Sequence, residues 1–187
     1  MFDLRIRIAL YACAVAPFAL TAPMPAFAEG SVVSIKLQDT TTDSHIPDMR
    51  LVLDHSTVTA GPVTLHAVNE SKRLGHEVLV FKDPSDPIPY NEGTGRAIEK
   101  QMNSLGEISD LDPGESHDKT FNLTPGTYLL LCNQANHLKA GMFARLKVVA
   151  AGTPIPADDK PTAEMMMAPP TKAVAVDASK DDDDDGS

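Results

Sequence analysis

The sequence contains no tryptophan, and only two of its 187 residues are cysteines. Two cysteines are too few for a disulfide-dense scaffold, so the chain has to fold around an apolar core, for which its length is sufficient. After residue 28, no apolar run approaches the roughly 20 residues that a membrane-spanning helix needs. Cations are also scarce: 16 Lys and Arg residues stand against 26 Asp and Glu residues. The resulting net charge of −10 argues against nucleic acid and anionic lipid as main partners.

The first 28 residues have the pattern of an export signal. Arg5 and Arg7 precede an apolar run over residues 8–20, which is too short for a membrane span. Ala26-Phe27-Ala28 then supplies an A-x-A cleavage site. We predict a cleaved secretory peptide over residues 1–28, with an uncleaved N-terminal anchor as the alternative. The pattern is typical of a bacterial periplasmic protein, so we expect the mature chain to be periplasmic and not membrane-spanning.

Cleavage at this site would remove Cys13 and leave Cys132 as the one cysteine of the mature chain. The periplasm is oxidising, so a lone thiol there is exposed to oxidation unless it is buried, paired between chains or bound to a metal. Cys132 is therefore the first residue whose role needs an explanation.

The other end of the chain has a different composition. Residues 151–187 are rich in proline, show little periodicity and include five consecutive aspartates, Asp181 to Asp185. Such a segment buries too little apolar surface to offset its ordering entropy, so we expect a disordered tail. Its Met165-Met166-Met167 cluster offers thioethers that suit Cu(I), although a chance cluster in a low-complexity segment is the alternative.

Residues 29–150 are predicted to form the folded domain. Short runs of β-branched and apolar residues alternate with Gly-Pro turns, and Val63, Leu65 and Ala67 share one face of such a run. The predicted strands cover residues 32–37, 49–53, 62–68, 76–81, 116–123, 127–132 and 142–149. This pattern predicts an all-β Greek-key β-sandwich. A longer insert over residues 83–108 is predicted to contain one short helix, over residues 95–105.

The strongest cluster of chemically versatile residues lies in LLCNQANHLKAGM, residues 130–142, where Cys132, His137 and Met142 follow a C-x4-H-x4-M spacing. The motif starts at the end of one predicted strand and ends at the start of the next. All three residues therefore belong to one connecting loop. His76 opens another predicted strand, HEVLVF, and a Greek-key topology can bring it to the same end of the sandwich.

A thiolate, two imidazoles and a distant thioether are the ligands of a type 1 copper site, which holds one ion that cycles between Cu(I) and Cu(II). We therefore predict that His76, Cys132, His137 and Met142 bind copper. The plainer alternative is a buried structural Cys, a structural His and a core Met that coincide in this order. His45 and Met49 are candidates for a peripheral copper site, with chance proximity as the alternative.

The stretches VNESKRLGHEVLVF, GEISDLDPGES and PGTYLLLCNQANHLKAGM, within residues 30–150, resemble the cupredoxin family of small blue copper proteins, of the plastocyanin and azurin type. They also resemble bacterial periplasmic cupredoxin-like copper-binding proteins. The resemblance implies that Tyr128 forms a Greek-key corner. One departure is Glu77, which follows His76 where the family often has an asparagine whose amide joins the two ligand loops. Because an ionised carboxylate cannot donate that hydrogen bond, we expect the side chain of Asn133 to join them instead.

The favoured function is one-electron transfer through the edge of His137, with Leu138, Ala140, Gly141 and Phe143 as an apolar docking patch. The acidic chain favours a basic redox partner such as a c-type cytochrome, or a respiratory complex. We expect a monomer.

The alternative function is copper tolerance, storage or delivery without obligatory redox turnover, with a copper donor or acceptor protein as the partner. The Met165–Met167 cluster, His45 and Met49 would favour it. An enzyme is not expected, because a multicopper oxidase needs a His-Cys-His link and residues 131–133 read Leu-Cys-Asn.

Overall fold

The computed structural model describes residues 30–40, 48–84, 86–157 and 159, and these form two packed β-sheets. The first sheet has the order β2-β1-β4-β7. Its strands are β1 (Ser31–Thr40), β2 (Asp48–Leu53), β4 (Gly61–Asn69) and β7 (Ser116–Leu123). The second has the order β3-β9-β8-β5-β6. Its strands are β3 (Thr57–Thr59), β5 (His76–Lys82), β6 (Ser104–Leu111), β8 (Gly126–Leu131) and β9 (Phe143–Val149).

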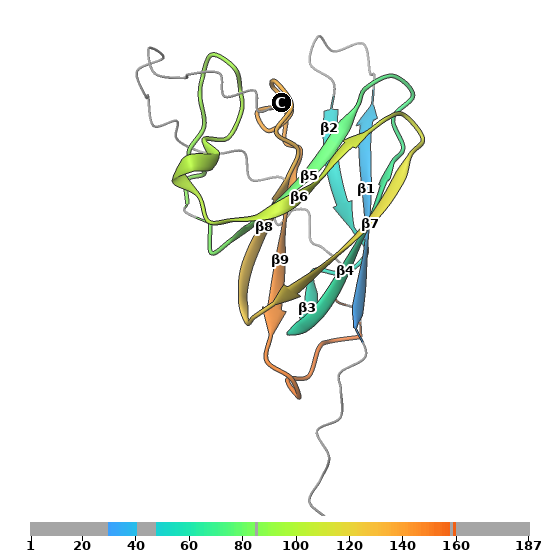
Figure 1. Ribbon diagram of the computed structural model, residues 1–187, viewed down its shortest axis with the longest axis vertical. Coiled ribbons are helices and arrows are strands. Elements are labelled where there is room, and N and C mark those ends of the chain that lie inside the picture. The colour runs from blue at the N-terminus through green and yellow to red at the C-terminus, as the bar shows by residue number, and fades with distance from the viewer. Residues whose placement is uncertain (1–29, 41–47, 85, 158, 160–187) are drawn as a thin grey trace, which may run out of the picture.

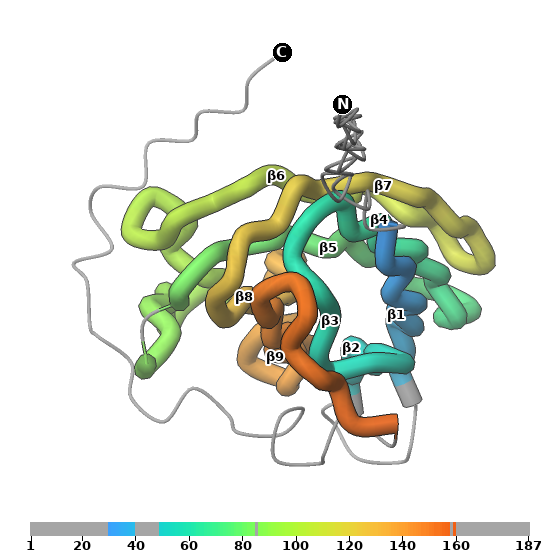
Figure 2. The backbone as a smooth tube through the Cα atoms, turned by 90° about the horizontal axis from the view of Figure 1, so that it is seen from below, coloured from blue at the N-terminus to red at the C-terminus, as the bar shows by residue number. Residues whose placement is uncertain are grey.

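The predicted all-β Greek-key sandwich is confirmed (Figures 1 and 2). Along the chain, the strands change sheet five times: between β2 and β3, β3 and β4, β4 and β5, β6 and β7, and β7 and β8. Most neighbouring strands are antiparallel, whereas β1 pairs with β4, and β3 with β9, in parallel. In the described part of the chain, no helix has the length and apolar character needed to cross a membrane.

The main core lies between the sheets. Alternate residues of each strand point inward, so Val63, Leu65 and Ala67 of β4 are at most 1% exposed. They meet Leu130 of β8 and Leu146 of β9 from the other sheet. The predicted shared face of residues 63, 65 and 67 is therefore correct.

Strands β5 and β8 are buried on both faces, which explains the nearly continuous apolar run at residues 128–132. Val80 of β5 and Leu130 of β8 point into the main core. Their neighbours Phe81, Leu129 and Leu131 point the other way, into a second apolar cluster. The insert between β5 and β6 covers that cluster with side chains of its own, namely Ile88, Tyr90, Ala97 and Met102. The insert therefore acts as a third layer over the outer face of this sheet.

The helix predicted over residues 95–105 is wrong. The only helical turn there is the short 3-10 helix η1 (Glu99–Gln101), and Ser104 already begins strand β6. Gly95 has a φ of +66°, and the backbone N–H of Ala97 donates to a side chain of another loop instead of to a helical carbonyl. Strand β6 and the three-residue strand β3 were not predicted; both are edge strands.

The expected Greek-key corner at Tyr128 is confirmed. Its hydroxyl donates to the carbonyl of Thr124 at 2.8 Å and accepts from the N–H of the same residue at 3.0 Å. The ring is 1% exposed. Tyr128 therefore fixes the turn that leads into β8, four residues before Cys132.

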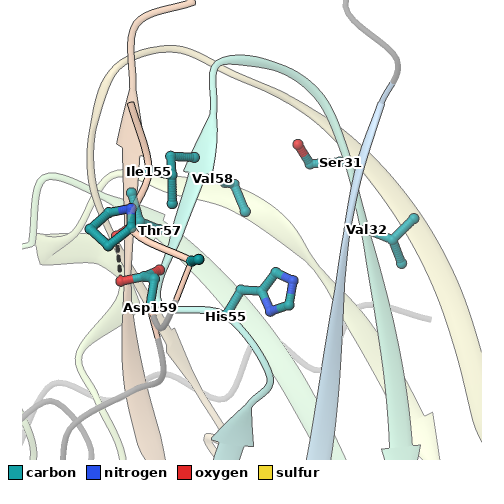
Figure 3. Close-up of a pocket in the computed structure, with 9 residues that line it drawn as sticks. Ser31, Val32, His55, Thr57, Val58, Ile155 and Asp159 are labelled. Carbon is teal, nitrogen blue, oxygen red and sulfur yellow. Dashed lines mark hydrogen bonds between the residues drawn. The ribbon is translucent and has the colours of Figure 1, made fainter. Parts of the chain in front are cut away.

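Beyond β9, the described part of the chain turns back toward β3. The carboxylate of Asp159 accepts from the hydroxyl of Ser56 at 2.7 Å and from that of Thr57 at 3.1 Å. A surface pocket lies there, lined by His55, Thr57, Val58, Ile155 and Asp159 among others (Figure 3). The predicted tail, residues 151–187, thus begins with a segment that contacts the sandwich; residues 160–187 lie outside the described residues.

Candidate metal centre

The strand order brings His76 and Cys132 to the same end of the sandwich. Strands β5 and β8 are antiparallel neighbours, with Leu79 opposite Leu131. His76 is the first residue of β5, and Cys132 directly follows the last residue of β8. An antiparallel pair places the start of one strand beside the end of the other, so the register brings His76 and Cys132 to the same end of the sheet.

His137 joins this pair through the loop over residues 132–142, here called the ligand loop. Its Nδ1 lies 3.2 Å from Sγ of Cys132 and 3.3 Å from Nδ1 of His76. The third distance, from Sγ of Cys132 to Nδ1 of His76, is 3.8 Å. Cys132, His76 and His137 are 0%, 1% and 8% exposed, respectively. The ligand atoms of these three residues converge within 4.8 Å, and no other such group of three occurs among the described residues.

The backbone of Met142 is tied to both loop residues of this triad. Its N–H donates to the carbonyl of His137 at 3.0 Å, and its carbonyl accepts from the N–H of Cys132 at 3.1 Å. The residue is fully buried and belongs to the main core cluster. The C-x4-H-x4-M spacing thus corresponds to a closed loop whose two ends are hydrogen-bonded to each other.

Burial keeps all three triad side chains neutral near pH 7. Burial raises the pKa of the Cys132 thiol to about 12. Burial, followed by the nearby His137, lowers the pKa of His76 to about 4, and burial also lowers the pKa of His137. Neutral imidazoles have free lone pairs, and a buried thiol is a site from which a metal ion displaces a proton.

The donor set fits a soft or borderline transition metal. One sulfur and two imidazole nitrogens suit Cu or Zn, whereas Mg²⁺ and Ca²⁺ need oxygen ligands. The other ring nitrogen of His76, Nε2, is buried without a hydrogen-bond partner, as is Oδ1 of Asp39. Asp39 lies close enough to act on both imidazoles, because its charge opposes the lowering of the pKa of His76 and of His137.

The connection between the two ligand-bearing segments differs from the one expected. Glu77 provides it after all, as an acceptor: its Oε1 accepts from the backbone N–H of Asn133 at 3.0 Å. The side chain of Asn133 instead contacts the insert, at Ala97 and Glu99. The expectation that the side chain of Asn133 joins the two segments was wrong, because the backbone N–H of Asn133 supplies the donor and Glu77 needs only to accept.

The predicted docking patch is also corrected. Leu138 and Phe143 are 0% and 2% exposed and belong to the second apolar cluster, beneath the insert. Only Ala140 and Gly141 of that set are partly exposed.

Of the further metal-site candidates, Met49 is 6% exposed and packs in the main core. His45 and Met165–Met167 lie outside the described residues.

Sequence reasoning missed the residues that hold the ligand loop from outside. Gly95 and Ala97 of the insert contact Asn133 and Asn136 of the ligand loop. These contacts join positions more than 30 residues apart. No local pattern links such positions, so only the fold reveals them.

Comparisons with known proteins return structural likeness only. No protein-family model matches the chain, and no curated protein matches it. Reduced auracyanin from Roseiflexus castenholzii is 23% identical, with 64% of this chain and 96% of that one covered and a TM-score of 0.45. Rusticyanin from Thiobacillus ferrooxidans is 16% identical, with 65% and 79% covered and a TM-score of 0.47. Another structure describes rusticyanin as a copper protein.

Auracyanin and rusticyanin are cupredoxins, the family that the sequence resembles. At these identities the likeness concerns the fold. The roles of individual residues have to come from the geometry of this chain.

Proposed function

We propose that the chain is a periplasmic type 1 copper protein that transfers single electrons and is not an enzyme. His76, Cys132 and His137 would hold one copper ion, with Met142 as a weak fourth ligand. The observation that carries this proposal is the convergence of one buried sulfur and two buried imidazole nitrogens within 4.8 Å. When bound, a copper ion in such a site supplies one-electron chemistry by alternating between Cu(II) and Cu(I).

The protein's own part is to hold the donors and to exclude water. Neutral His76 and His137 present Nδ1 toward the sulfur, and the buried thiol loses its proton to form the strong ligand. Burial of all three side chains leaves little room for a substrate, which favours an electron carrier over an enzyme. His137, at 8% exposed, reaches closest to solvent within the triad. We therefore propose that electrons enter and leave through its ring edge.

The partner we propose is a c-type cytochrome or a respiratory complex, met by a monomer. The net negative charge of the chain is a poor guide to the sign of the docking face, because Lys72, Arg73 and Lys139 are exposed on the segments that carry His76 and His137. Weak redox encounters use small interfaces, so a few such side chains can set the salt dependence of the rate.

Copper tolerance, storage or delivery remains the competing function, and the described residues do not favour it. Met49, one of the residues that would support a second copper site, is buried in the core. Reduction of the copper protein by a c-type cytochrome, compared with transfer of Cu(I) to a chelator, separates the two functions.

The primary test is spectroscopic. The mature protein given Cu(II) should show an intense visible thiolate-to-copper band, and Cys132→Ala should abolish it. A wild-type protein that binds Cu(II) without colour contradicts the type 1 assignment.

A further inference from the structure

The side chain of Asn133 forms hydrogen bonds with both the backbone N–H and the backbone carbonyl of Ala97 in the insert, as the backbone of a neighbouring β-strand would. Its Oδ1 accepts from the N–H of Ala97 at 2.6 Å, and its Nδ2 donates to the carbonyl of Ala97 at 3.3 Å. Nδ2 also donates to the carboxylate of Glu99 at 2.7 Å. A flipped amide would place donor against donor, so the surroundings define its orientation. These three hydrogen bonds fix the side chain of Asn133, the residue that directly follows Cys132.

A second contact holds the middle of the ligand loop. The N–H of Asn136, the residue before His137, donates to the carbonyl of Thr94 at 2.9 Å. Gly95 permits this approach: its φ is +66°, and a Cβ there would lie 2.8 Å from Cα of Asn136. The insert is itself stiffened at this point, because Oδ1 of Asn91 accepts from the N–H groups of Gly93 and Thr94.

The same part of the insert is anchored in the second apolar cluster. Tyr90 and Ala97 pack there with Leu138, which directly follows His137 and is fully buried. Residues 90–99, here called the insert clamp, therefore contact the ligand loop next to Cys132, before His137 and after it. Figure 1 shows the insert and the ligand loop at the same end of the sandwich.

We infer that the insert clamp is a positioning device that holds Cys132 and His137 ready for metal in the metal-free protein, through Asn133 and the Gly95–Asn136 contact. This inference deepens the proposed copper function and rests on it for its consequence. A ligand loop fixed from outside rearranges little when metal binds or changes oxidation state. It also releases Cu(I) slowly, which suits an electron carrier better than a delivery protein.

The first test uses the full metal-free protein and hydrogen exchange. The amides of Ala97 and Asn136 should be protected in the wild type. Asn133→Ala should speed exchange at Ala97 by about 10-fold, because a buried N–H loses its acceptor. Asn122→Ala, at an exposed position on β7, is the matched control and should leave both amides unchanged. Unprotected amides in the metal-free wild type, or an unchanged rate in Asn133→Ala, would overturn the inference.

The second test separates positioning from plain stability. In the copper-loaded protein, Asn133→Ala should release Cu(I) to an excess of chelator about 10-fold to 100-fold faster and should shift the visible band. Gly95→Ala should act in the same direction by pushing the insert away from Asn136. Tyr128→Phe, which weakens the fold away from the insert clamp, should keep the wild-type release rate and band. If release follows stability alone across these three variants, the insert clamp has no positioning role.

A fallback variant and a measurement on the metal-free protein allow the insert clamp to be tested separately from the proposed copper function. If Asn133→Ala does not fold, Glu99→Ala, at an exposed position, removes only the 2.7 Å hydrogen bond that Asn133 donates to Glu99 and should give an intermediate release rate. A colourless copper complex would refute the proposed function, yet the hydrogen-exchange result on the metal-free protein would stand. Conversely, an intense band with unprotected Ala97 and Asn136 amides would refute only the insert clamp.

Discussion

The carboxylate of Glu77 and the backbone N–H of Asn133 are joined by a hydrogen bond of 3.0 Å, directly beside the two residues His76 and Cys132 that we propose as copper ligands. The carboxylate is partly buried, and the group that donates to it is a backbone N–H, which carries no formal charge. A negative charge there is therefore poorly compensated, and it influences both the stability of the fold and its pH dependence.

The first prediction concerns that charge in the metal-free protein. Burial, with help from the nearby charge of Glu107, raises the pKa of Glu77 from 4.5 to about 7. Between these values the folded protein holds a proton that the unfolded chain has lost, so this group's contribution to the free energy of unfolding falls as pH rises toward 7. Glu77→Gln keeps an acceptor oxygen but removes the charge. It should be more stable than the wild type by about 1 kcal/mol at pH 8, after allowance for partial solvent screening, with the gap closing near pH 4.5.

Urea denaturation of both proteins at pH 5 and pH 8 measures this difference, and contributions from other groups cancel between them. Glu77→Ala is the control for the hydrogen bond. It should be less stable than Glu77→Gln by about 1 kcal/mol at both pH values, because the N–H of Asn133 loses its acceptor. A difference between Glu77→Gln and the wild type that is the same at both pH values would contradict the prediction.

The second prediction is the number of protons released on metal binding. Burial holds the pKa of Cys132 at about 12 and lowers the pKa of His76 to about 4 and that of His137 below its usual range. Near pH 7.5, the thiol is thus protonated and both imidazoles are neutral. Zn²⁺, which takes the same donors without redox chemistry, should release about one proton per ion.

Calorimetric titration in buffers of different ionisation enthalpy counts these protons. Cys132→Ser should release close to none at the same pH, since its hydroxyl does not ionise there. Release of two or more protons by the wild type would mean that an imidazole is charged in the metal-free protein.

The third prediction tests the corner at Tyr128. Its hydroxyl satisfies both the carbonyl and the N–H of Thr124, so Tyr128→Phe should cost about 1–2 kcal/mol of unfolding free energy. The copper spectrum should not change. Tyr90→Phe is the matched control: that hydroxyl makes one 3.2 Å hydrogen bond to Glu92, and its loss should cost about 0.5 kcal/mol. Equal losses of unfolding free energy in the two variants would show that the hydrogen bonds of the corner stabilise the fold no more than the single hydrogen bond of Tyr90.

The β-strands were largely predictable because alternation depends on local sequence. Residues 116–123 were predicted as a strand with both ends correct, and Ser116–Leu123 is β7. The insert was not predictable in the same way. Ala97, Ile98 and Met102 have helical spacing, but Ala97 and Met102 face the second apolar cluster because the segment packs on β5 and β8. Apolar spacing shows that a face is buried without showing which partner buries it.

For the candidate site too, the sequence predicted the residues that lie close together along the chain and missed those that come from distant segments. Cys132, His137 and Met142 lie within eleven consecutive residues, so one loop and one motif place them together. His76 needed only the inference that its strand starts at the same end of the sandwich. The contacts of Asn133 with Ala97 and Glu99 span 36 and 34 positions, and they depend on where the insert folds over the sheet. Ligands that share a loop can thus be predicted from the sequence. The residues that support them cannot, because they come from distant segments.

The last prediction concerns Met142, which we propose as the weak axial ligand. Met142→Leu nearly conserves volume at a fully buried position, so it should change the free energy of unfolding by less than about 1.5 kcal/mol. Replacing the thioether with an alkyl group removes one ligand and makes the surroundings of copper more apolar, and both changes disfavour Cu(II), which carries the higher charge. The visible band should therefore persist while the reduction potential rises. Met102→Leu, in the insert and partly buried, is the matched control and should leave the potential unchanged. Direct electrochemistry of the three proteins gives the answer, and equal potentials for Met142→Leu and the wild type would show that Met142 is a core residue and not a ligand.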